Sequence, residues 1–280
     1  MANEYTPTQL AAHIRKVWSK EIGLTATEEQ KLVPNCKRME KIEGQLAYRK
    51  FGTLTAQSLA DGTVGSGLTN SGNTEVTVSL TPATKYVMVI VNLNTAARCA
   101  FDPKTPLRTQ MQGSLYELVD RTVGALASGF TTNVVGGATR LLDDALIREA
   151  KRKLITSAKS AYKVGEKKFV AVIHPQDFEE LDGIEAFYRA DIRGDKENPL
   201  VNGAVYQARG GYWSESGNIQ QDTVTRNMMF LPGESLGIGY NMEYAVKMEE
   251  YELVYKLIAW VDFGVQTLFD EYCVLMQTQP

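Results

Sequence analysis

The sequence has few of the residues on which catalytic and metal sites depend. Its 280 residues include 3 cysteines and 2 histidines. Cys36, Cys99 and Cys273 are far apart and form no CxxC pair, which argues against a zinc site. An odd number of widely spaced cysteines predicts reduced, buried thiols rather than a disulfide framework. His13 and His174 are the only imidazoles, so no metal is expected.

Long hydrophobic runs and an excess of basic charge are also missing. The longest apolar run, residues 86–91, is far shorter than the roughly 20 residues that cross a bilayer. Residues 1–9 lack the basic region and apolar core of a signal peptide. The net charge of -3 lacks the surplus of lysine and arginine typical of autonomous nucleic-acid binding. We therefore expect no membrane association.

No catalytic motif stands out. The chain has no GxSxG elbow, and the GxG at residues 237–239 lacks the third glycine of a dinucleotide site. His174 and Cys273 could pair as base and nucleophile, but such distant residues carry little information. Asp143 and Asp144 are explained by a helix N-terminus. The sequence predicts neither an enzyme nor a cofactor.

Residues 1–44 are predicted to form an arm rather than a domain. Thr6 and Pro7 are typical of a helix start, with the hydroxyl as cap and proline in the first turn. Apolar residues follow at helical spacing: Leu10, Ile14, Val17 and Trp18. A short amphipathic helix needs a larger surface to cover its apolar stripe, on this subunit or on a neighbour.

Residues 45–93 are predicted to form one long β-hairpin. Its strands are 46–54 and 74–80, followed by the apolar strand 86–92. Between them, residues 61–73 read DGTVGSGLTNSGN, a turn-forming composition that predicts a mobile tip. One face of the middle strand is apolar: Val76, Val78 and Leu80. An extended hairpin with an apolar face requires a partner to cover it.

The rest of the chain alternates between helices and strands. Residues 102–129 predict the longest helix, a rod of roughly 36 Å at 1.5 Å per residue. A second helix is predicted over 143–162, followed by a buried strand at 169–173 and a helix that begins at Pro175. Residues 182–217 are rich in glycine and predicted to be irregular. Four strands are expected in the last part of the chain: 228–231, 244–249, 251–261 and 272–277.

This order of elements resembles the Hong Kong phage capsid fold, which tailed-phage major capsid proteins share with encapsulins. Two segments resemble family patterns: FVAVIHPQDFEEL at 169–181, and VDFGVQTLFDEYCVLMQT at 261–278. The resemblance covers nearly the whole chain. It implies an α+β fold with an N-terminal arm, an extended loop, a spine helix in a peripheral domain, and an axial domain.

The resemblance also implies boundaries and a function. The implied parts are the arm at 1–44, the extended loop at 45–93, the peripheral domain at 94–138, the axial domain at 139–230 and closing strands at 231–280. The expected function is a structural capsid protein that forms the icosahedral shell around the double-stranded DNA of a bacteriophage. An encapsulin-type compartment is the alternative, and an enzyme with an unfamiliar site is the third possibility.

Assembly would depend on contacts between subunits. The expected contact residues lie on the arm, the extended loop and the axial loops: Trp18, Phe51, Val76, Val78, Leu80, Tyr188, Arg189, Arg193 and Tyr212. The resemblance implies pentamers and hexamers, a separate scaffolding protein, a portal and a cement protein. It also implies non-specific contact with packaged DNA and assembly in the host cytoplasm.

Overall fold

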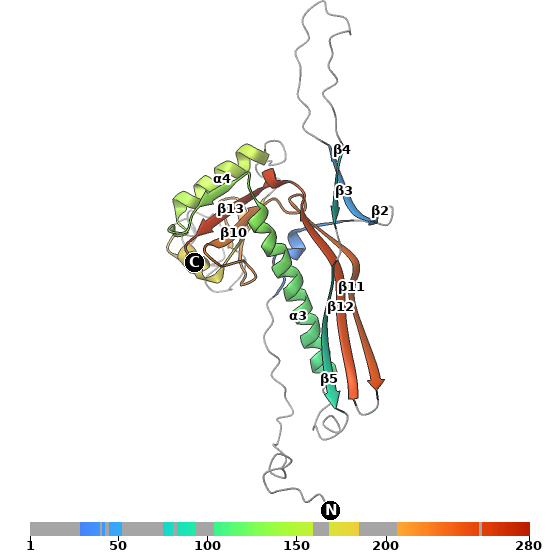
Figure 1. Cartoon of the computed structure of the whole chain (residues 1–280). Coiled ribbons are helices and arrows are strands. Elements are labelled where there is room, and N and C mark those ends of the chain that lie inside the picture. The colour runs from blue at the N-terminus through green and yellow to red at the C-terminus, as the bar shows by residue number, and fades with distance from the viewer. Residues whose placement is uncertain are drawn as a thin grey trace, which may run out of the picture.

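A computed structural model gives the fold of most of the chain. It describes residues 29–39, 41–42, 45–51, 75–80, 83–92, 104–158, 168–184, 206–251 and 254–280. These residues form a four-stranded, a six-stranded and a three-stranded sheet, together with helices (Figure 1). The mixture of elements confirms the α+β prediction.

Helix α3 (Lys104–Ala125) is the longest described helix and continues into the 3-10 helix η2 (Leu126–Gly129). Both lie within the helix predicted over 102–129, which is confirmed. Pro106 lies in the first turn, where its missing N–H breaks no helical hydrogen bond. Buried apolar residues recur every four positions along one face: Met111, Leu115, Val119 and Val123. This face is the central surface of the first hydrophobic core.

The four-stranded sheet is long and narrow, and α3 covers one of its faces (Figure 1). Its strands, in spatial order, are β1 (Lys37–Arg38), β11 (Leu236–Tyr251), β12 (Val254–Thr267) and β5 (Ala83–Asn92). The short β1 is parallel to β11, whereas the other pairs are antiparallel. Val87 and Val89 of β5, and Leu257 and Ala259 of β12, pack in the same core as α3.

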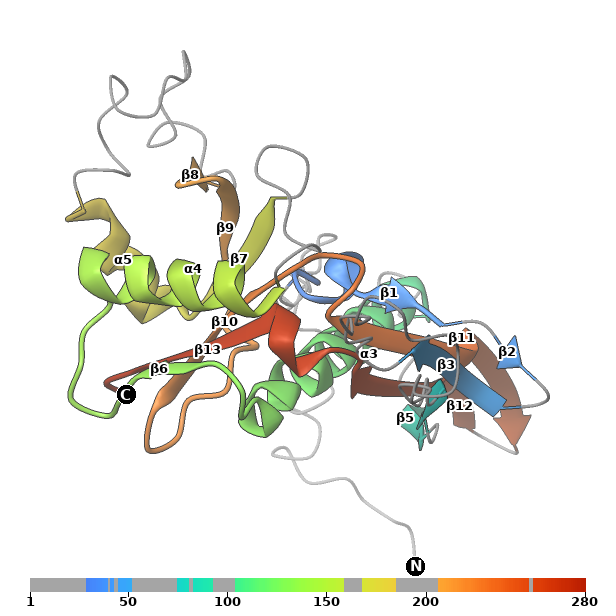
Figure 2. The same cartoon turned by 90° about the horizontal axis from the view of Figure 1, so that it is seen from above.

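The six-stranded sheet forms the second body of the molecule (Figure 2). Its strands, in spatial order, are β6 (Val134–Gly136), β13 (Cys273–Thr278), β10 (Thr225–Phe230), β7 (Phe169–Ile173), β9 (Gly211–Glu215) and β8 (Tyr206–Ala208). Both faces are buried. Val170 and Val172 of β7 join the core of α3, whereas Phe169, Ala171 and Ile173 join a second core. The sheet therefore links the two cores.

Helices α4 (Asp144–Ala158) and α5 (Pro175–Asp182) supply the second core with their apolar faces. The Oδ1 atom of Asp143 accepts a hydrogen bond from the backbone N–H of Leu146 at 2.6 Å. Asp143 therefore caps α4, as its position in the sequence predicted. His174 caps α5 through Nδ1, which accepts from the backbone N–H of Gln176 at 3.4 Å.

The hairpin prediction is correct in one half and wrong in the other. Strand β3 (Gln45–Phe51) pairs with β4 (Glu75–Leu80), and β2 (Lys41–Ile42) pairs with β3. Strand β5, however, leaves this small sheet and pairs with β12. This pairing buries one face of the apolar run, because Val87 and Val89 of β5 then pack in the core under α3.

The region predicted to be irregular contains two strands. Strands β8 and β9 form a hairpin through Arg209 and Gly210, whose φ angles are 52° and 83°. Two positive φ angles are typical of a tight hairpin turn, which usually contains asparagine and glycine. Arg209 takes this unusual place because its guanidinium binds Asp144 on α4, while its carbonyl accepts from Lys151 at 2.5 Å.

Candidate assembly surfaces

The long sheet presents an apolar face to solvent on the side away from α3. In an antiparallel sheet, directly paired residues project from the same face. Tyr86 pairs with Trp260, and Met88 pairs with Ile258. Tyr86, Met88 and Ile90 are 68%, 45% and 58% exposed.

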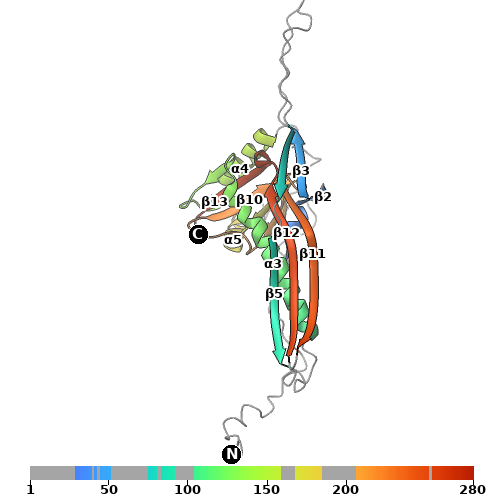
Figure 3. The ribbon, with the colours of Figure 1, turned by 45° about the vertical axis from the view of Figure 1, so that its right-hand side comes forward.

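Strand β11 adds Met242, whose sulfur accepts a hydrogen bond from Trp260 Nε1 at 3.0 Å. We define the outer apolar face as Tyr86, Met88, Ile90, Met242, Ile258 and Trp260. These side chains belong to three neighbouring strands, whose backbones are seen side by side in Figure 3. Charged residues share the face, since Lys256 pairs with Ile90 and Lys247 pairs with Ile258. Exposed apolar residues grouped on one face of a sheet are typical of a contact with another molecule.

A buried carboxylate attaches the segment at 29–39 to α3. Asp120 is fully buried, and its Oδ1 accepts from the backbone N–H groups of Leu32 at 2.9 Å and Val33 at 3.0 Å. Its Oδ2 accepts from the backbone N–H of Lys31 at 3.3 Å and from Asn218 Nδ2 at 3.1 Å. One side chain therefore fixes the end of the arm and a loop of the six-stranded sheet to the helix.

A shallow cleft of about 330 Å³ lies where the arm meets the long sheet. Its walls come from the 30–38 segment, from Tyr116 on α3 and from Tyr240 on β11. The Arg38 guanidinium lies 5.6 Å from the centre of the Tyr240 ring and binds Glu243. Burial raises the pKa of Tyr240 to about 12, against the opposing effect of Arg38.

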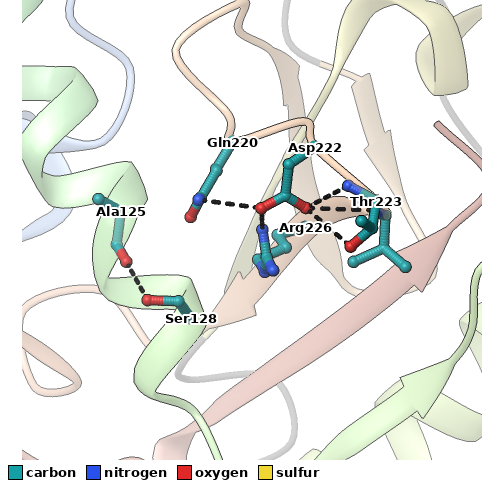
Figure 4. Close-up of polar contacts among 7 residues, drawn as sticks. Ala125, Ser128, Gln220, Asp222, Thr223 and Arg226 are labelled. Carbon is teal, nitrogen blue, oxygen red and sulfur yellow. Dashed lines mark hydrogen bonds and ion pairs between the residues drawn. The ribbon is translucent and has the colours of Figure 1, made fainter.

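The loop that precedes β10 is held by an internal polar cluster (Figure 4). Asp222 Oδ1 accepts from the backbone N–H of Thr223 at 2.6 Å, and Oδ2 accepts from Arg226 NH1 at 2.6 Å. Gln220 donates to the same carboxylate at 3.3 Å. The hydrogen bond from Arg226 lowers the pKa of Asp222 to about 2, so the cluster stays ionised in mildly acidic solution.

The predicted contact residues are distributed over several elements. Phe51 ends β3, and three others alternate along β4: Val76, Val78 and Leu80. Tyr212 lies on β9, 40% exposed, with Lys168 Nζ 4.9 Å from its ring centre. The remaining four lie outside the described residues: Trp18, Tyr188, Arg189 and Arg193. The contacts themselves remain predictions.

Cys273 and His174, the pair considered from the sequence as nucleophile and base, lie far apart in the six-stranded sheet. Cys273 pairs with Phe230, which pairs with Val170 at the start of β7. His174 follows Ile173 at the other end of β7, so the two side chains lie at opposite ends of the sheet. Within the described part of the chain, no group of three or more potential ligands could hold a metal ion.

Both described cysteines are expected to be chemically inert. Burial raises the pKa of Cys36 to about 12 and raises the pKa of Cys273 well above its usual range. Because the thiolate is the reactive form, a Cys99→Ser variant should take up no maleimide at pH 7 while folded. The same variant in urea should take up two labels, as measured by mass spectrometry. Rapid labelling of the folded protein would contradict this structure.

The structure is similar to chains of solved phage structures, some of which are described as capsids. A chain of Mycobacterium phage Che8 matches with a TM-score of 0.71 and 17% identity, covering 94% of this chain and 96% of that one. The capsid structure of cyanophage P-SCSP1u matches with a TM-score of 0.69 and 13% identity, over 99% of both chains. The chain has the fold of these capsid subunits.

A third similar structure comes from the capsid of a native GTA particle, with a TM-score of 0.69 and 12% identity over 100% of both chains. No family model matches the chain, and no curated protein matches its sequence. The fold that the resemblance implied is therefore confirmed by structure, at an identity too low for sequence comparison. No helix among the described residues is both long enough and apolar enough to cross a membrane.

Two features of the structure were missed from the sequence. The outer apolar face escaped notice because its residues come from three strands far apart in the chain, although Ile258 and Trp260 alternate as one face of β12. Asp120 was missed because an acid beside an apolar helical stripe is usually solvated. Its place between Val119 and Val123, on the buried side of α3, was the available signal.

Proposed function

We propose that this chain is a structural major capsid protein, without enzymatic activity, that self-assembles into the icosahedral shell of a tailed double-stranded DNA bacteriophage. The similarity in fold to phage capsid chains, over nearly the full length, is the observation that carries this proposal. A shell subunit acts through its contacts with other subunits and therefore needs no catalytic site.

Three parts of the subunit supply the contacts. The arm at 1–44 clasps a neighbour through Trp18, and the extended loop lies across an adjacent subunit with Phe51, Val76, Val78 and Leu80. The axial loops, with Tyr188, Arg189, Arg193 and Tyr212, meet around five-fold and six-fold axes. Contacts between different surfaces of successive subunits generate rings, and many weak contacts suffice in a closed shell.

The proposed function keeps the domain boundaries expected from the sequence, except for the place of strand β5. We propose an arm at 1–44, a peripheral domain built on α3, and an axial domain at 139–230, with closing strands at 231–280. The extended loop at 45–93 then contains β3 and β4 as its hairpin. Its last strand, β5, belongs to the four-stranded sheet of the peripheral domain, an assignment that its pairing with β12 supports.

We propose further that the subunit assembles in the host cytoplasm with a separate scaffolding protein and a portal, and that a cement protein can bind the finished virion. Contact with packaged DNA is non-specific, in keeping with a net charge of -3. The contents of purified particles test this proposal against the encapsulin alternative. Nuclease-resistant double-stranded DNA supports a phage capsid, whereas a protein cargo with no nucleic acid contradicts it.

Deleting residues 62–73 from the extended loop should weaken the shell without unfolding the subunit. The deleted segment connects β3 and β4 in the sequence, and the proposed role of the loop makes its loss one of contacts between subunits. We expect shells that dissociate at a lower urea concentration, or no shells, by electron microscopy and sedimentation. Circular dichroism of the subunit should be unchanged. Shells of unaltered stability would refute the role of the loop.

A further inference from the structure

Strand β5 is an edge strand of the long sheet. It pairs with β12 on one side, and no described residue pairs with its other side. Ten residues form the strand, and residues 86–91 within it read YVMVIV, without charge, proline or glycine. A long edge whose central residues are uncharged and mostly β-branched is a ready template for another strand, and natural proteins usually protect such edges.

We propose that a second copy of this chain covers the edge, with the two β5 strands pairing antiparallel around a two-fold axis. The inference rests on the proposed shell function and adds a specific contact to it. A second extended strand can satisfy the free N–H and C=O groups of the edge with backbone hydrogen bonds in place of those to water. The strand that fits the apolar centre of this edge best is one of the same composition, and β5 itself is such a strand.

The symmetry of this pairing suits a shell. The two-fold axis of an antiparallel strand pair is perpendicular to the sheet, so rotation about it preserves the two faces. Both α3 helices then lie on one side of a continuous eight-stranded sheet, and both outer apolar faces lie on the other. A closed shell requires two-fold axes of this kind, along which the inner and outer sides of each subunit are retained.

The side chains restrict the register. Because faces are preserved, residues of the outer face must oppose residues of the outer face, which excludes every register that is shifted by one residue. A pairing centred on Met88 places Tyr86 opposite Ile90 and Val87 opposite Val89. It also places Lys85 opposite Val91, so no like charges meet. Met88 lies on the axis, opposite Met88 of the second copy.

Cysteine cross-linking tests this arrangement. In a Cys99→Ser background, Met88→Cys places two thiols directly opposite each other, at the Cα separation of about 4.5–5.5 Å that a disulfide spans. Met242→Cys is the matched control, since Met242 is as exposed as Met88, at 45%, but lies on β11, two strands from the edge. After mild oxidation of assembled shells, Met88→Cys should give at least tenfold more disulfide-linked dimer than the control. Equal cross-linking of the two variants, or none, would overturn the pairing.

Opposite charges at the axis provide a second test. Met88→Lys alone and Met88→Glu alone each place like charges opposite each other and should block assembly. An equimolar mixture of the two should restore it, as counted by electron microscopy, because each lysine can then face a glutamate. Such mutual rescue requires that Met88 meets its own counterpart, so a mixture that fails to assemble would contradict the proposal.

These tests separate two failures. Wild-type shells without cross-linking of Met88→Cys would remove the β5 contact and leave the capsid function intact. Failure of the wild-type chain to form any shell would overturn both.

Discussion

Gly136→Ala is expected to lower the free energy of unfolding by about 2–5 kcal/mol. Gly136 ends β6 with φ +85°, a conformation that side chains with a Cβ rarely adopt. A Cβ there would lie 2.0 Å from the carbonyl oxygen of Gln277 on β13. The strands are held this close because the N–H of Gly137 donates to the same oxygen at 2.9 Å. The clash is with backbone, so no side-chain rotation relieves it.

Gly137→Ala is the matched control. A Cβ at this neighbouring glycine would meet no atom within 4 Å, so the expected change is within about 0.5 kcal/mol. Both variants are measured by urea unfolding of the dissociated subunit, followed by tryptophan fluorescence. A Gly136→Ala variant as stable as Gly137→Ala would show that β6 does not approach β13 as described.

Asp120→Ala should cost about 3–5 kcal/mol of subunit stability and release the segment at 29–39 from α3. The substitution leaves the N–H groups of Leu32 and Val33 and the amide of Asn218 without their acceptor in a buried site. Each unsatisfied buried donor costs about 1–3 kcal/mol. The loss is a large part of the stability of an ordinary domain, about 5–15 kcal/mol.

Two further substitutions give this prediction its controls. Asp120→Asn keeps one acceptor oxygen but places an NH2 group towards the donors of Lys31 and Asn218, so an intermediate loss is expected. Glu117→Gln, on the same helix, breaks only a surface pair with Arg121 and should cost at most about 1 kcal/mol. Limited proteolysis should cleave Asp120→Ala within 29–39 much faster than Glu117→Gln. Equal cleavage of the two would contradict the anchoring role of Asp120.

Local patterns in the sequence predicted much of this fold. Helix α3 and strand β7 follow from the spacing of their own apolar residues, and Asp143 and Pro175 mark helix starts by local chemistry. Each of these signals lies within one element. Their order along the chain then pointed to the capsid fold, which the structural similarity confirms.

Strand pairings between segments far apart in the chain could not be predicted from such local patterns. The sequence placed β5 beside β4, its neighbour in the chain, whereas the structure pairs it with β12, more than 160 residues later. Strands β8 and β9 were missed because they are short and their turn uses Arg209 in place of asparagine. In each case the interaction that stabilises the observed structure is tertiary. Helix α3 covers one face of β5, and the ion pair between Arg209 and Asp144 holds the turn.

The proposed shell function depends on surfaces of the subunit that another subunit can cover. The outer apolar face is exposed to solvent, and no strand among the described residues pairs with the outer edge of β5. Exposed apolar faces and strand edges favour aggregation of a monomer, whereas in a shell they can form contacts between subunits.

The assembly state of the purified full-length chain tests this claim most directly. Sedimentation velocity combined with electron microscopy, over a range of protein and salt concentrations, measures it without any variant. We expect closed shells, or rings of five and six subunits, in equilibrium with free subunits. A stable monomer under every condition would contradict it.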